Sequence, residues 1–170
     1  MLSVGLLLAG SLAMAGTPLS GTYTINAGSA TGGTNFASFN DLEDSLTTNG
    51  ISGAVTVNVV ASSGPYSERV VFNEVTGASA TNTITINGNG EKILNTASSS
   101  TIEMNGADYF TFNNLVIEAA GTGNGTRCVH FWRSADYNTF KNGEMIISKY
   151  TGTSSSGAAY VAFSNSKSTP

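Results

Sequence analysis

The sequence is poor in charged residues, cysteine and proline. Of its 170 residues only 11% are Asp, Glu, Lys or Arg, one is cysteine and three are proline. The single Cys128 excludes an intrachain disulfide. Seven basic residues at a net charge of −4 cannot form the dense Lys/Arg surface that nucleic acid requires, so we expect no nucleic-acid partner. Low charge combined with many small polar residues disfavours a helical bundle and favours a β-rich extracellular protein.

The chain also lacks an apolar run long enough to span a membrane. Residues 1–15 are apolar but short, are interrupted by Gly and Ser, and end in Ala13-Met14-Ala15, a signal-peptide cleavage pattern. We interpret them as a signal peptide, which predicts a protein that is secreted to the extracellular space or the cell surface. The positively charged segment that normally opens such a peptide is missing, which would place the true start upstream.

What the chain does contain is a repeat. Residues 107–112 read Ala-Asp-Tyr-Phe-Thr-Phe, and residues 135–140 read Ala-Asp-Tyr-Asn-Thr-Phe. Each copy lies between short runs of alternating apolar residues. A repeat of about 28 residues made of strands and turns predicts a stacked solenoid rather than a closed globule. After Gly53 the same pattern of short strands and Gly, Asn or Ser turns predicts roughly three to four such coils.

A single helix is predicted before these coils, over residues 39–47, and a short strand precedes it over residues 21–25. Ser38 can cap the helix, and Asp41 three residues later completes a capping-box pattern. Three apolar residues form one stripe along the helix: Phe39, Leu42 and Leu46. We expect this amphipathic helix to cover the open end of the solenoid core.

The repeats align in columns of equivalent residues. Two apolar columns are predicted to face inward: Ile102, Val129 and Val161, and Met104, Phe131 and Phe163. One column is predicted to face outward: Glu103, His130 and Ala162. Asn114 and Asn142 correspond at a turn, where stacked asparagines can hydrogen-bond along the axis. The second copy has one extra residue after Phe131, which predicts a bulge near Trp132 or Arg133.

The segment from Asn35 to Gly90 resembles a known superfamily. The run from Gly64 to Val70 is similar to its G-x-Y-x-E-x-V turn and strand, and the run from Asn82 to Gly90 to its following strand. These are the right-handed parallel β-helix proteins of the pectin lyase-like type. The chain is also similar to the N-terminal β-helix of large secreted surface proteins of Bacteroidetes.

This resemblance implies an all-β fold, a right-handed parallel β-helix with an N-terminal capping helix. We divide the chain into the signal peptide (1–15), an N-terminal strand and capping helix (16–53) and the β-helix coils (54–170). The coils end just after an inward-alternating strand, so we expect the chain to be truncated at its C-terminus or its apolar end to be covered by a partner or another copy.

Enzymes of this superfamily that cleave or de-esterify pectin carry paired Asp residues with Arg or Lys on one outer strand face. The sequence shows no such cluster, so we assign no catalytic residue, no metal ligand and no cofactor. The candidate binding residues lie around one outward strand: Glu103, Arg127, His130, Trp132 and Arg133. Arginine and an aromatic plane can hold an acidic sugar. The alternative is a solvated Glu–His pair, arginines lying along the surface and a packed tryptophan.

Two further candidates have structural alternatives. Asp108 and Asp136 would form either a cation site or acid/base pair, or two corner carboxylates that accept backbone N–H groups. Cys128 would be either an inert buried thiol or a nucleophile assisted by His130, two residues away.

Three functions remain open at this point. The first is a non-catalytic, secreted β-helix module of a cell-surface or adhesion protein that binds carbohydrate such as polysaccharide or cell-surface glycans. The second is a polysaccharide lyase or glycoside hydrolase fragment acting on acidic polysaccharide. The third is a fibre subunit that associates end to end with copies of itself.

Overall fold

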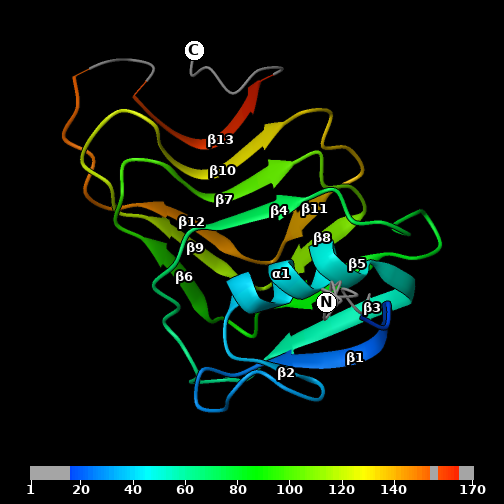
Figure 1. Cartoon of the computed structure of the whole chain (residues 1–170). Helices are drawn as coiled ribbons and strands as arrows, with labels where there is room; N and C mark the ends of the chain where they lie inside the picture. Colours follow the sequence, from blue (N-terminus) through cyan, green and yellow to red (C-terminus); the bar gives the residue numbers. More distant parts are fainter. Residues whose placement is uncertain (1–15, 154–156, 165–170) are drawn as a thin grey trace, which may run out of the picture.

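The computed structural model describes residues 16–153 and 157–164. In these residues the chain forms a parallel β-solenoid of about five turns, with one short helix among the strands. Strands from successive turns lie one above the other (Figure 1). The predicted signal peptide, residues 1–15, and the end of the chain, residues 165–170, lie outside the described residues. Within the described residues no helix is long and apolar enough to cross a membrane.

Three sheets form the walls of the solenoid, and every pairing between their strands is parallel. Sheet A has the order β11-β8-β5-β3-β1-β2, sheet B the order β12-β9-β6 and sheet C the order β13-β10-β7-β4. The strands of sheet A are β1 (Leu19–Ile25), β2 (Asn35–Phe36), β3 (Ile51–Val59), β5 (Ile84–Asn87), β8 (Phe110–Asn113) and β11 (Thr139–Lys141). Those of sheet B are β6 (Lys92–Asn95), β9 (Val116–Ala119) and β12 (Glu144–Ile147). Those of sheet C are β4 (Val70–Asn73), β7 (Ser100–Asn105), β10 (Thr126–Trp132) and β13 (Ala158–Ser164).

The predicted register between turns is confirmed in sheet C. The strands pair in the three predicted columns: Ile102–Val129–Val161, Met104–Phe131–Phe163 and Glu103–His130–Ala162. Ile102, Met104 and Val129 are buried, Phe131 on β10 is half-buried, and Phe163 on β13 is 76% exposed. No described strand pairs with the outer edge of β13, so the last members of both inward columns remain uncovered.

The solenoid has more turns than the coils predicted after Gly53, because a further turn precedes that residue. About five turns are present, and the first contains β1, which pairs in parallel with β3. The extra residue of the second repeat lies next to Trp132, close to the predicted position. It is part of the turn after β10, where Arg133 and Ser134 have positive φ angles of 53° and 55°, and does not form a strand bulge.

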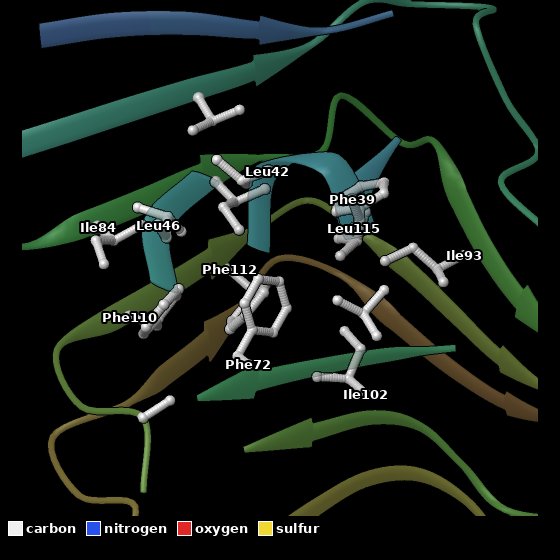
Figure 2. Packing of buried hydrophobic residues seen from close by; sticks show 14 of the residues in the cluster. Phe39, Leu42, Leu46, Phe72, Ile84, Ile93, Ile102, Phe110, Phe112 and Leu115 are labelled. Carbon is white, nitrogen blue, oxygen red and sulfur yellow. The ribbon is translucent and has the colours of Figure 1, made fainter. Parts of the chain in front are cut away.

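The helix α1 spans Phe39–Asn49, and its predicted cap and apolar stripe are both present. Ser38 Oγ accepts a hydrogen bond of 3.0 Å from the Asp41 backbone N–H. The Asp41 side chain accepts a hydrogen bond from the Thr31 hydroxyl, a contact that the capping-box pattern did not predict. The apolar stripe of α1 is fully buried, together with Phe72 and the aromatic residues of β8 (Figure 2).

The Glu68 carboxylate joins the segment before β4 to the first turn of α1. It accepts the backbone N–H groups of Phe39 and Asn40 at 2.9 and 3.0 Å, and the Asn40 side-chain amide at 2.7 Å. Burial raises the pKa of the Glu68 carboxyl, and these hydrogen bonds partly offset the effect. The G-x-Y-x-E-x-V run therefore fixes the helix as well as forming a turn and strand.

A ladder of asparagine amides connects successive turns along sheet A. Asn87 donates to Asn58 Oδ1 at 2.9 Å, Asn113 donates to Asn87 Oδ1 at 3.0 Å, and Asn142 donates to Asn113 Oδ1 at 2.8 Å. Asn114 and Asn142 correspond as predicted, since each follows paired strand residues and occupies a left-handed turn position, with φ angles of 54° and 56°. The amide of Asn142, however, hydrogen-bonds Asn113 rather than Asn114.

We predict that Glu68→Ala lowers the free energy of unfolding by about 1–3 kcal/mol, because two partly buried N–H groups of α1 lose their acceptor. Glu68→Gln keeps one side-chain oxygen and should lower it less. Urea denaturation followed by circular dichroism measures the change. The matched control is Ser67→Ala at the exposed neighbouring position. Equal stability of the Glu68→Ala and Ser67→Ala variants would show that the carboxylate does not hold the helix.

We predict that Asn87→Ala lowers the free energy of unfolding by about 1–2 kcal/mol, because it breaks two hydrogen bonds of the ladder. Thr85→Ser is the control, since Thr85 lies two residues away on the same outer face. The same denaturation experiment compares the two. A loss no larger than that of the control would mean that the ladder does not stabilise the stack.

Candidate functional site

The outer face of sheet C contains a pocket of about 200 Å³, which we call the outer pocket. It is lined by polar and charged residues and by one glycine: Ser98, Ser99, Ser100, Glu103, Asn124, Gly125, Arg127 and His130. Three of the five residues predicted from the sequence to bind a ligand are therefore brought together here. The other two, Trp132 and Arg133, lie outside it.

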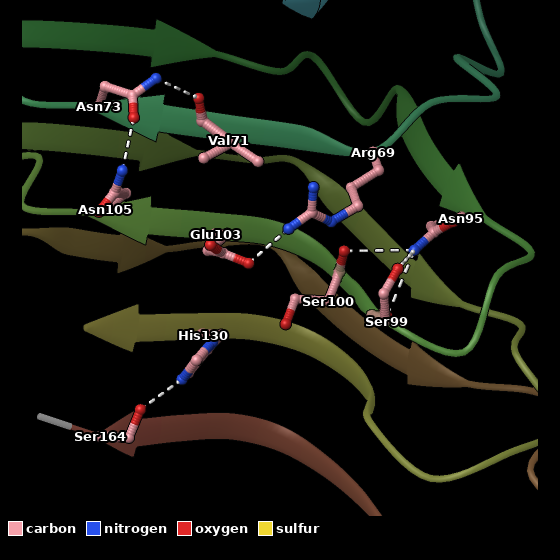
Figure 3. A network of polar contacts seen from close by, with 10 residues as sticks. All are labelled: Arg69, Val71, Asn73, Asn95, Ser99, Ser100, Glu103, Asn105, His130 and Ser164. Atoms are coloured by element: carbon pink, nitrogen blue, oxygen red, sulfur yellow. Dashed lines mark hydrogen bonds and ion pairs between the residues drawn. The ribbon is translucent and has the colours of Figure 1, made fainter. Parts of the chain in front are cut away.

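One wall of the outer pocket is formed by the loops that precede β7 and β10. The Asn95 amide donates to Ser99 Oγ at 3.0 Å and to the Ser100 carbonyl at 3.2 Å, and these contacts hold the serine run in place (Figure 3). In the next turn, the Gly123 N–H donates to Ser98 Oγ at 2.8 Å. A side chain at Gly121 would collide with the Ala97 carbonyl, which explains why this loop is rich in glycine.

Glu103 is ion-paired with an arginine that the sequence reasoning did not select. Arg69, just before β4, places its Nη2 atom 2.5 Å from Glu103 Oε2 (Figure 3). The Glu103 side chain is largely buried, whereas that of Arg69 is 37% exposed. The negative charge of Glu103 is therefore compensated within the protein.

His130 lies opposite Glu103 on the neighbouring strand, as the register predicted. Its Nε2 atom is 2.8 Å from Ser164 Oγ on β13 (Figure 3). A carboxylate beside His130 would by itself favour the imidazolium form. The pKa of His130 is nevertheless lowered from 6.5, first by burial and then by the Arg127 guanidinium, and Glu103 only partly opposes these effects. Neutral imidazole is therefore the favoured form at neutral pH.

Arg127 is the residue of the pocket whose charge is not compensated. It lies on β10 opposite Ser100 and is only 5% exposed. Among the described residues its guanidinium forms neither an ion pair nor a hydrogen bond. A guanidinium in a sheltered pocket is screened by solvent less than one on an open surface, so a ligand that supplies hydrogen-bond acceptors or negative charge would be stabilised at this position.

Trp132 and Arg133 contact each other beyond the end of the outer pocket. The Arg133 guanidinium carbon lies 4.6 Å from the centre of the Trp132 ring, a cation–π geometry, and Trp132 itself is buried. Arg133 borders a separate hollow of about 390 Å³ with Asn73, Glu74, Asn105 and Gly106. The aromatic plane predicted to stack on a sugar is thus covered by Arg133.

Cys128 is part of the core rather than of the pocket. It is fully buried, its Sγ contacts the Ile146 carbonyl at 3.3 Å, and burial raises the pKa of the thiol to about 11. A thiol with this pKa is almost fully protonated at neutral pH and is a poor nucleophile. These observations favour the inert thiol.

Asp108 and Asp136 connect the corners of two successive turns. Asp108 Oδ1 accepts a hydrogen bond of 2.5 Å from the Asp136 backbone N–H. This contact favours the structural alternative, in which a carboxylate at a corner accepts a backbone N–H group. The acceptor, Asp108, and the donor, Asp136, lie on different turns. Nowhere in residues 16–153 and 157–164 are three His, Cys, Asp or Glu side chains grouped so that they could hold a metal ion.

Sequence reasoning missed the polar loop residues that line the pocket, Ser98, Ser99, Ser100 and Asn124, and the two residues outside it that contact Glu103 and His130, Arg69 and Ser164. One signal could have found Arg69. The inward column of Ile102 and Val129 continues to Val70 on β4, and extending it would have put Arg69 beside the outward column. The serines and Asn124 lie in loops, where no alternation of apolar residues indicates which way a side chain points.

Comparison with models of protein families, with curated proteins and with solved structures finds no match for this chain. What the outer pocket can bind therefore follows from its own side chains. Serine hydroxyls, the Asn124 amide and a guanidinium offer hydrogen bonds to a polar ligand, and the neutral imidazole of His130 can accept or share a proton.

We predict that the pKa of His130 lies below 6.5 in the folded protein and rises in Arg127→Gln, because that variant removes a neighbouring positive charge. His130 is the only histidine, so one imidazole signal in a proton NMR titration reports it. Arg133→Gln, outside the pocket, should leave the titration unchanged.

The same depressed pKa affects stability. Between the pKa of His130 in the folded protein and 6.5, the unfolded chain binds more protons than the folded chain. The contribution of His130 to the free energy of unfolding is therefore present above pH 6.5 and is lost as the pH falls through the folded pKa. An His130 pKa at or above 6.5 in the wild type would contradict the electrostatics described here.

Proposed function

We propose that this protein is a secreted module of a cell-surface or adhesion protein, and that it binds carbohydrate in the outer pocket without transforming it. The observation that carries the proposal is the largely buried Arg127 side chain, which lines the outer pocket among hydroxyl and amide groups and whose guanidinium has no ion pair or hydrogen bond within the described residues. Sugars are recognised by such convergent hydrogen-bond donors and acceptors. The Ala13-Met14-Ala15 cleavage pattern supports secretion.

We further propose that the solenoid is right-handed and related to the pectin lyase-like β-helices, similar to the N-terminal β-helix of Bacteroidetes surface proteins. Parallel strands joined by crossovers are overwhelmingly right-handed. In this proposal α1 is the amphipathic N-terminal cap. Its support is that α1 contacts β1, β2 and β4 and that its apolar stripe belongs to the core.

Binding without catalysis is favoured because Glu103 and His130, the two candidate acid/base groups of the pocket, already contact other side chains of the protein. Glu103 is held in an ion pair with Arg69, and His130 Nε2 already contacts Ser164. A glycoside hydrolase needs two carboxyl groups that flank the scissile bond. Within the outer pocket Glu103 is the only carboxyl group among the lining residues.

A lyase acting on acidic polysaccharide is the second candidate, and the neutral His130 beside Arg127 favours it. Arg127 would bind the carboxylate of a uronate and so acidify the neighbouring C–H group. His130 would take that proton while the glycosidic C–O bond breaks, a C=C bond forms, and the leaving oxygen takes a proton from solvent.

End-to-end association is the third candidate. Its support is the apolar end of the last described turn, where Val161 is 39% and Phe163 is 76% exposed beside the edge of β13 that pairs with no described strand. Concentration-dependent filaments in electron microscopy would favour this candidate over an independent binding module.

We predict that the wild-type protein binds at least one member of a panel of neutral and acidic oligosaccharides, and that Arg127→Gln weakens this binding about tenfold or more. Loss of a charge-assisted hydrogen bond in a sheltered site is worth about 1.5–3 kcal/mol. Isothermal titration calorimetry measures the affinities, with Arg133→Gln as the matched control. Equal affinity of Arg127→Gln and wild type would refute binding in the outer pocket.

The lyase candidate is tested on the same panel. An increase in ultraviolet absorbance reports the unsaturated product of an elimination, and we expect none. Turnover that disappears in His130→Ala would replace the binding proposal with the lyase.

A further inference from the structure

The fixed charges around the outer pocket leave one positive charge without a counter-ion. Arg69 and Glu103 form an ion pair with a separation of 2.5 Å and together contribute no net charge. Arg127 contributes one positive charge, and His130 contributes none in its neutral form. Binding of a single negative charge would therefore bring the pocket to neutrality.

His130 is placed to respond to such a charge. The charged groups that act on it are Arg127 on its own strand β10, Glu103 on β7 and Arg69 just before β4. From β13 it faces the Ser164 hydroxyl, which can either donate to or accept from the imidazole. A proton on His130 is thus opposed by two guanidinium groups and by burial, and favoured by one carboxylate that is already paired.

We infer that the outer pocket is a proton-coupled anion site: Arg127 binds one carboxylate or sulfate group of the glycan, and His130 binds a proton from solvent more readily once that group is bound. The inference rests on the proposed function and specifies which part of a glycan the pocket recognises. A planar guanidinium presents paired N–H donors that match the oxygens of a carboxylate or a sulfate.

Electrostatics explain why the two events are coupled. The bound anion cancels the repulsion between Arg127 and a protonated imidazole, and adds an attractive charge in the same pocket. Burial strengthens both effects because solvent screens them poorly. Coupling is reciprocal, so the anion raises the proton affinity of His130 and the proton raises the affinity for the anion by the same factor.

The coupling fixes the sign of the pH dependence. Affinity for an acidic ligand should rise as the pH falls from 8 toward the pKa of free His130 and then level off. Each unit by which the ligand raises the pKa of His130 corresponds to about a tenfold gain in affinity across this range. A neutral sugar should show no such dependence.

The experiment follows the His130 imidazole by NMR in the full chain, at constant ionic strength set with sodium chloride. Sodium sulfate, sodium glucuronate and glucose are added in separate titrations. We expect sulfate, glucuronate or both to raise the pKa of His130 by at least about half a unit, and glucose to leave it unchanged. The response to each anion tells whether sulfate esters or carboxylates are the recognised groups.

Three variants make the test specific. Arg127→Gln should abolish the pKa change, whereas Arg133→Gln, a guanidinium outside the pocket, should retain it. His130→Gln should still bind the effective anion in calorimetry but lose the pH dependence of its affinity. This variant therefore separates the role of His130 from a folding defect.

The failure of this inference is distinguishable from failure of the proposed function. If neither anion changes the His130 titration in the wild type, the proton-coupled anion site is overturned even when an oligosaccharide binds. If sulfate changes the titration but no oligosaccharide of the panel binds, the anion site stands and carbohydrate binding is overturned.

Discussion

Every structural feature of this protein depends on the in-register stacking of its turns. Parallel backbone hydrogen bonds set the distance between strands at about 4.8 Å, so equivalent residues of successive turns are forced into contact. Apolar residues such as Ile102 and Val129 can therefore fill the interior only as continuous columns. The Asn58–Asn87–Asn113–Asn142 ladder uses the same repeat distance for amide hydrogen bonds, which reinforces the register that produces it.

The same constraint creates the electrostatic problem of the outer face. Stacking puts Glu103 directly opposite His130, and neither residue can move along the strand without breaking the columns. The protein neutralises Glu103 with Arg69 from the preceding turn and keeps His130 uncharged through burial and Arg127. The contacts that accommodate the neighbouring Glu103 carboxylate and His130 imidazole thus leave the positive charge of Arg127 without a counter-ion. An acidic ligand would therefore gain the most binding free energy at Arg127.

The columns and the helix could be predicted from the sequence because both are periodic. Alternation with a period of two identifies inward residues, and the repeat identifies their partners, which is why Glu103, His130 and Ala162 were aligned correctly. The side chains and loops that cover the outer face of sheet C could not be predicted in this way. How much of that face is covered depends on the reach of Arg69 and of residues 98–100. Whether Trp132 is covered depends on the left-handed turn that places Arg133 over its ring. Such turns have no periodic signature, so the environment of an outward residue is decided by long side chains and loops.

The outer pocket is a property of the stack rather than of any single repeat. Glu103 lies on β7, Arg127 and His130 on β10, and Ser164 on β13, so three consecutive strands of sheet C contribute to one set of contacts, together with Arg69 from the segment before β4. Repeats of this kind have little stability alone, because each buries its apolar face only against its neighbours. Loss of the last turn would remove Ser164 from His130 and expose the imidazole to solvent, which would weaken the burial that keeps it neutral. The chemistry of the pocket is therefore set by how many turns are stacked around it, and not only by the residues that line it.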